Sequence, residues 1–143
     1  MTSFSSGRLL SLPVRLHGIA LGRPVDLILR PETMRLLGLE VRCGDETHRF
    51  LPLAAARIGE HEIAIDSPLL LLDELPFYRG QGRSFQALRG ARVRAGRAEA
   101  GTLKDMLVGD DGKIERLLVE GPGGARDVPV DGVLLEEPRA RAA

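Results

Sequence analysis

Short apolar runs that alternate with polar residues, separated by turn-forming residues, make up most of this chain. In 24–29 the apolar residues Val25, Leu27 and Leu29 recur at every second position, the period of a strand with one buried face. The run 36–42 places Leu37, Leu39 and Val41 on one face in the same way. Arg-Pro-Glu-Thr at 30–33 is typical turn material, so the two runs predict a β-hairpin.

The same kind of pattern predicts the remaining elements. Further strands are expected at 48–53, 62–65, 103–108, 114–119, 127–130 and 133–135, with a short element at 55–58. The Gly-Asp-Asp-Gly turn at 109–112 is a stronger hairpin signal than its counterpart at 30–33. Residues 1–6 are predicted to be frayed, and Pro13 favours a strand start within 9–16.

Between these two sets of strands lies a segment with few strand signals. Residues 67–72 predict a short helical or irregular connector. Pro76, Gly80 and Gly82 break any longer helix, which makes 75–83 a linker. Residues 84–88 are expected to form one helical turn capped by Ser84.

An internal repeat organises the chain, because most of the stretch 22–41 recurs at 101–119. Gly22 and Asp26 are each followed 79 positions later by the same residue, at Gly101 and Asp105. After the first turn the spacing falls to 78, and it falls to 77 where Leu-Pro-Leu at 51–53 matches Val-Pro-Val at 128–130. Length changes confined to turns are what repeated β units show, since strands do not tolerate them.

The repeat and the strand pattern predict the fold class and its boundaries. We expect an all-β chain of two small antiparallel barrels in tandem, joined by a short, partly helical linker. The predicted units are 7–74, a linker at 75–84, a second unit at 85–137 and a tail at 138–143. Units this small have marginal cores, so we expect them to pack on each other or on another chain.

One family matches this order of elements. The stretch GRPVDLILRPETMRLLGLEV, followed by HRFLPLAAARI, resembles the PRC-barrel family, whose units read as Gly, a polar pair, an apolar strand, a turn, a second strand and an apolar-Pro-apolar strand. The resemblance covers about 9–66 well and 88–136 less completely. It implies a PRC-barrel fold and a binding role without catalysis, as in the cytoplasmic part of the photosynthetic reaction centre H subunit and the C-terminal domain of a ribosome maturation factor.

Composition and charge narrow the function classes. The chain has 20 basic and 20 acidic residues, and this zero net charge argues against global attraction to nucleic acid or membranes. Cys43 is the only cysteine, which excludes an intramolecular disulfide. No apolar run approaches the roughly 20 residues of a membrane span, and the N-terminus lacks a signal-peptide pattern. We therefore expect a cytoplasmic protein without a transmembrane segment.

Charge is unevenly distributed in the second part of the chain. The segment 79–104 contains seven basic residues and one acid, Glu99, whereas 105–137 contains nine acids and three basic residues. The candidate basic patch consists of Arg79, Arg83, Arg89, Arg92, Arg94 and Arg97, with Lys104 completing the segment. Either the two charge groups neutralise each other on a solvated surface, or they form a bipolar surface that selects a charged partner or RNA.

Residues with catalytic or ligand-binding potential are few. His17, His48 and His61 lack metal-ligand spacing, and the Gly-Pro-Gly-Gly run at 121–124 is interpreted as a hairpin loop. Asp26 and Asp105 are expected to accept backbone hydrogen bonds near a strand start. We expect no catalytic residue, no metal and no cofactor, with any ligand site in the groove between the two halves near 75–83.

The predicted function is that of a non-enzymatic interaction or adaptor module. Four apolar residues lie off the alternation that fills a barrel and therefore need cover: Ile28, Leu36, Leu107 and Leu118. We expect them to form the contact between the barrels or the seam of a homodimer. Two alternatives are RNA or ribosome-assembly binding through 79–104, and regulation by docking on a membrane transporter or photosynthetic complex.

Overall fold

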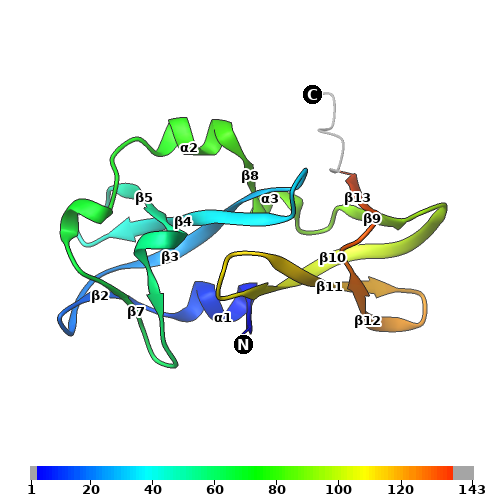
Figure 1. The fold of residues 1–143 in the computed structure, drawn as a ribbon, viewed down its shortest axis with the longest axis horizontal. Coiled ribbons are helices and arrows are strands. Elements are labelled where there is room, and N and C mark those ends of the chain that lie inside the picture. Colours follow the sequence, from blue (N-terminus) through cyan, green and yellow to red (C-terminus); the bar gives the residue numbers. More distant parts are fainter. Residues whose placement is uncertain (1–2, 137–143) are drawn as a thin grey trace.

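Two β-sheets, each built mainly from one repeat (Figure 1), share one central hydrophobic core. The structure is a computed structural model that describes residues 3–136. The first sheet runs in the order β5-β4-β3-β2-β7-β6, with β8 also paired to β3, and the second in the order β12-β11-β10-β9-β13, with β1 also paired to β10. All neighbouring strands are antiparallel except β2 and β7.

Most strands lie where the apolar runs predicted them, although the two long ones extend further. The short strands Ser3–Ser5 and Arg83–Ser84 were not predicted. The first sheet comprises β2 (Val14–Leu16), β3 (Ile19–Arg30), β4 (Arg35–Cys43), β5 (His48–Pro52), β6 (Arg57–Ile58), β7 (Ile63–Ile65) and β8 (Arg83–Ser84). The second comprises β1 (Ser3–Ser5), β9 (Arg92–Ala95), β10 (Ala98–Gly109), β11 (Ile114–Gly121), β12 (Gly124–Pro129) and β13 (Val133–Glu136). The helical elements are α1 (Ser6–Ser11), η1 (Leu53–Ala55), η2 (Pro68–Leu70), α2 (Leu75–Gln81) and α3 (Phe85–Leu88).

The two repeats exchange their first strand and helix. β8 and α3 open the second repeat, yet β8 pairs with β3 of the first sheet, with Ser84 opposite Ile28. β1 and α1 open the first repeat and stand 79 residues earlier, yet β1 pairs with β10 of the second sheet, with Ser5 opposite Leu107. Each repeat therefore completes the sheet of the other.

Asp26 and Asp105 fasten the exchanged segments, which confirms their predicted role as acceptors of backbone hydrogen bonds. Asp26 Oδ1 accepts from the N–H of Leu27 (2.8 Å) and of Gln86 in α3 (3.0 Å), and the Ser84 hydroxyl donates to its other oxygen. Asp105 Oδ1 accepts from the N–H of Met106 (2.7 Å) and of Ser6 in α1 (2.9 Å). A carboxylate at a helix start satisfies N–H groups that have no partner within the helix.

Bulges at matching positions of both hairpins aim these carboxylates. In each hairpin the register shifts just before the aspartate, so that one extra residue bends the strand. The repeated glycine lies in the same strand as each aspartate. A Cβ added to Gly22 would lie 2.4 Å from the Arg42 carbonyl oxygen, and one added to Gly101 would lie 2.3 Å from the Glu120 carbonyl oxygen. Only a residue without a side chain fits so close to a neighbouring backbone.

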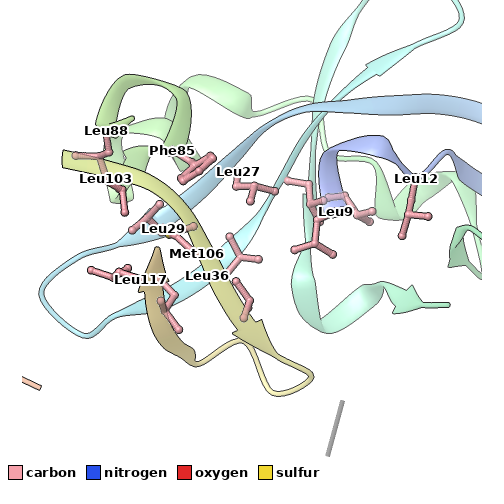
Figure 2. Close-up of a cluster of buried hydrophobic side chains, with 14 of the residues drawn as sticks. Leu9, Leu12, Leu27, Leu29, Leu36, Phe85, Leu88, Leu103, Met106 and Leu117 are labelled. Carbon is pink, nitrogen blue, oxygen red and sulfur yellow. The ribbon is translucent and has the colours of Figure 1, made fainter. Parts of the chain in front are cut away.

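The core crosses from one repeat to the other without a boundary. Figure 2 shows Leu27 and Leu29 of β3 among Leu103, Met106 and Leu117 of the second sheet, with side chains of α1 and α3 in the same cluster. Two backbone hydrogen bonds tie the hairpins together in a two-fold manner, from the N–H of Leu36 to Gly112 O (2.8 Å) and from the N–H of Ile114 to Met34 O (2.9 Å).

The expectation of two closed barrels needs correction, because both sheets are open and neither repeat forms a closed barrel. Residues 3–5 form β1 rather than a frayed end, since their backbone pairs with β10. Leu37 lies on the opposite face from Leu39, because a bulge between Ile28 and Leu29 leaves it without a partner in β3. The predicted turn capped by Ser84 is confirmed, with its side chain accepting from the N–H of Ala87. The predicted tail at 138–143 lies outside the described residues.

Candidate interaction surface

The outer face of the first sheet is covered by α2, the helix that connects the repeats. Ile28 of β3, Phe50 of β5 and Leu75 of α2 form a second, small core that is separate from the central one. The rings of Phe50 and Tyr78 stack with centroids 4.1 Å apart. Just before the helix, Leu72 exchanges two backbone hydrogen bonds with Phe50, at 2.9 and 2.8 Å, and so extends the sheet by one residue.

A buried carboxylate holds this helix in place. Glu40 of β4 is only 3% exposed, and it accepts hydrogen bonds from the Arg79 guanidinium of α2 while lying 2.6 Å from Nδ1 of His48. Burial alone raises the pKa of Glu40, but the hydrogen bonds from His48 and Arg79 outweigh it, so the pKa is lowered overall. The charged form of Glu40 is therefore the form that fastens α2.

The outer face of the second sheet carries a shallow cavity instead of a helix. The cavity has a volume of about 160 Å³ and is lined by Ser5, Asp105, Met106, Leu107, Arg116, Leu118 and Asp127. Leu107 and Leu118 are half-buried, whereas their neighbours Met106 and Leu117 point into the core. Arg116 and Asp127 form a loose ion pair of 3.8 Å at the rim, with 46% and 61% of their side chains exposed.

The four predicted interface residues are thus placed in three different environments. Leu36 lies where the repeats meet, with its side chain in the shared core. Ile28 is fully buried beneath α2, so its cover comes from within the chain and neither from the second repeat nor from a second copy. Leu107 and Leu118 come together on the open outer face. Leu72, Leu75 and Tyr78 recur at every third position, a spacing that signals the apolar side of α2 in the sequence.

Most cations of the basic segment pair with acids or with other groups of the same chain. Arg79 binds Glu40, and Arg89 donates to the side-chain oxygen of Gln86. Further ion pairs join Arg92 to Glu99 (3.9 Å), Arg94 to Glu136 (3.2 Å) and Lys104 to Glu120 (2.7 Å). Arg83 also has an interaction partner, and Arg97 lies exposed in the turn between β9 and β10. Only the pairs of Arg94 and Lys104 join the basic segment to acids of 105–137, because Arg79 and Arg92 pair with Glu40 and Glu99 outside that acidic group.

The histidines are spread over the molecule. His48 contacts Glu40, His61 lies 3.9 Å from Glu60 on the surface, and His17 occupies a turn with a positive φ of 49°. Within residues 3–136, no three His, Cys, Asp or Glu side chains come close enough to hold a metal ion.

The segment 75–83, near which a ligand groove was predicted, forms α2 and the start of β8 and packs onto the first sheet. A cavity of about 520 Å³ lies between the repeats at another place, where Phe4 and Leu9 face Leu53 and Val108. Its lining includes the buried side chains of Leu9 and Val108 as well as the charged residues Arg57, Glu60 and Asp110. Among the helices of the described chain, none is both long enough and apolar enough to cross a bilayer.

The sequence matches none of the protein-family models, and no curated protein is similar enough to count as a homologue.

Proposed function

We propose that this chain is a non-enzymatic interaction module related to PRC-barrels, and that it acts as an adaptor for a protein partner. The observation that carries the proposal is the contrast between two equivalent sheet faces. One is sealed by α2, and the other carries the half-buried apolar side chains of Leu107 and Leu118 around a cavity. Apolar surface gathered on one face of a sheet is typical of a site for another protein.

The roles of the buried polar residues support a module without catalysis. The buried polar residues of the described chain are Ser6, Asp26 and Glu40. Ser6 and Asp26 fasten the exchanged segments, and Glu40 fastens α2. Each of these groups is held by partners of the fold, whereas a catalytic acid or base needs access to a substrate.

Resemblance in the order of elements supports the relation to PRC-barrels. Each kind of position in the motif has a structural role in this chain. Gly22 allows a close backbone approach, Asp26 caps α3, and the apolar positions fill the shared core. RNA binding through 79–104 is less well supported, since most of those cations contact carboxylates of the same chain. Docking on a membrane transporter or photosynthetic complex remains a prediction of the resemblance.

Affinity capture from cells of the source organism at physiological salt tests the adaptor role. We expect a stoichiometric protein partner that rebinds the purified chain with a Kd of about 10 µM or tighter, which corresponds to roughly 7 kcal/mol. Parallel capture after nuclease treatment separates this outcome from RNA binding. Recovery of ribosomal RNA that falls steeply with salt, or of no stoichiometric protein at all, would contradict the proposal.

A further inference from the structure

The cavity over Leu107 and Leu118 has a covered counterpart in the same molecule. Through the repeat, Leu107 stands in the place of Ile28, Leu118 in the place of Glu40 and Asp127 in the place of Phe50. The remaining lining residues correspond in the same way to Ser84, Asp26, Leu27 and Gly38. In the first repeat, this surface lies beneath α2.

The elements around the cavity also correspond. α2 contacts β3, β5 and β8, and its Arg79 binds Glu40 of β4. The equivalent strands β10, β12, β1 and β11 supply the residues that line the cavity. In the first repeat the segment that leads into α2 also pairs with the edge of β5, through the bridge between Leu72 and Phe50. Within residues 3–136, Asp127 of β12 forms no such bridge. The second repeat therefore leaves open both the face and the strand edge that the first repeat covers.

We propose that this face binds a short amphipathic helix of a partner protein, preceded by an extended residue that pairs with the edge of β12. The inference rests on the proposed interaction function and names its site and the kind of partner. Strand addition followed by helix docking combines two common modes of peptide recognition, in which backbone hydrogen bonds set the register and apolar side chains supply affinity. α2 shows that this scaffold accommodates such a segment.

Differences between the two faces define the chemistry of the partner helix. Leu118 replaces the carboxylate that binds Arg79, so the partner presents an apolar side chain where α2 presents arginine. Asp127 replaces the ring on which Tyr78 stacks, so that position favours a polar or basic side chain. The partner helix carries a first apolar residue over Leu107, as Leu75 does beside Ile28, and a second apolar residue one turn later.

A peptide derived from α2 tests the site directly. The probe is a synthetic peptide with the sequence of residues 70–82 carrying Arg79→Leu, titrated to about 1 mM into the full chain with methyl-labelled Ile and Leu. We expect chemical-shift changes at the methyl groups of Leu107 and Leu118, with those of Ile28 unchanged. The unmodified peptide should bind at least about tenfold more weakly, since its guanidinium would lie against Leu118 without a carboxylate.

Variants of the protein supply the controls. Leu107→Lys and Leu118→Lys should each weaken peptide binding at least about tenfold, whereas Leu134→Lys, at an exposed site on β13, should leave it unchanged. Methyl shifts at Ile28 instead of Leu107, or no shifts at 1 mM peptide, would overturn the inference. A dimer seen by sedimentation that dissociates in Leu107→Lys would also overturn it, because the occupant would then be a second copy.

The same variants separate this inference from the adaptor role. If a captured partner binds wild type and Leu118→Lys equally well, the adaptor role stands and the site is wrong. If no partner is captured and the peptide does not bind, both fail. Loss of the captured partner in Leu118→Lys but not in Leu134→Lys supports both.

Discussion

Replacing Asp26 by alanine removes the carboxylate that fastens the first sheet to the opening helix of the second repeat. Three donors lose their acceptor: the N–H groups of Leu27 and Gln86 and the hydroxyl of Ser84. Asp26 is only 9% exposed, so water replaces it poorly. Each buried donor without a partner costs about 1–3 kcal/mol, and the buried charge that is removed offsets part of the total. We expect Asp26→Ala to lower the free energy of unfolding by about 3–5 kcal/mol.

Equilibrium urea unfolding followed by far-UV circular dichroism measures this change, because the chain contains no tryptophan for fluorescence. Asp26→Asn keeps one carbonyl acceptor for the two N–H groups and should cost about 1–2 kcal/mol. Asp131→Ala, at an exposed residue of the turn before β13, is the matched control and should stay within about 0.5 kcal/mol of wild type. A free energy for Asp26→Ala within 1 kcal/mol of wild type, with an unchanged m-value, would refute the reasoning.

Three further predictions concern the exchange between the repeats, the ion pair that holds α2 and the close backbone approach at the repeated glycine. Fragments 1–82 and 83–143 should each be unfolded alone, because each supplies a strand and helix to the other's sheet. When mixed, they should regain a cooperative unfolding transition. Independent folding of either fragment would contradict the exchange. The pKa of Glu40 is lowered in the folded state from its ordinary value of 4.5. Glu40 therefore stabilises the fold when the pH is above 4.5, and this stabilisation is lost as the pH falls through the folded-state pKa. Glu40→Gln should therefore be less stable than wild type at pH 7. Its urea unfolding midpoint should also fall less steeply as the pH is lowered into the acid range. Neither difference from wild type is expected if Glu40 does not hold α2. Gly101→Ala should lower the free energy of unfolding by more than about 2 kcal/mol, since φ is +135° and a Cβ would lie 2.3 Å from a carbonyl oxygen. Gly80→Ala in α2 is the control, because its Cβ meets open space and the change should be neutral or slightly stabilising. Equal melting temperatures for the two variants would argue against the close approach.

Local signals in the sequence were enough for most strands, for the turns and for the repeat, but not for the short strands β1 and β8. Alternation of apolar residues requires only that a strand has one buried face, so it locates β3 and β4 without knowledge of their partners. The matched spacing of Gly22 and Asp26 with Gly101 and Asp105 indicated shared backbone roles, which the close approach and the helix caps bear out. Ser84 was recognisable as a cap because the capping hydrogen bond spans only three residues.

Only the tertiary structure decided how the two repeats are combined. A three-residue strand such as β1 has the same residues and alternation whether it pairs with its own repeat or with the other, so no local pattern reveals the exchange. The exchange also explains why closed barrels do not form, since each sheet is completed by a segment of the other repeat. The cover over Ile28 escaped prediction for a related reason. A seven-residue helix is too short to be stable alone, and α2 exists because Ile28, Phe50 and Glu40 lie beneath it.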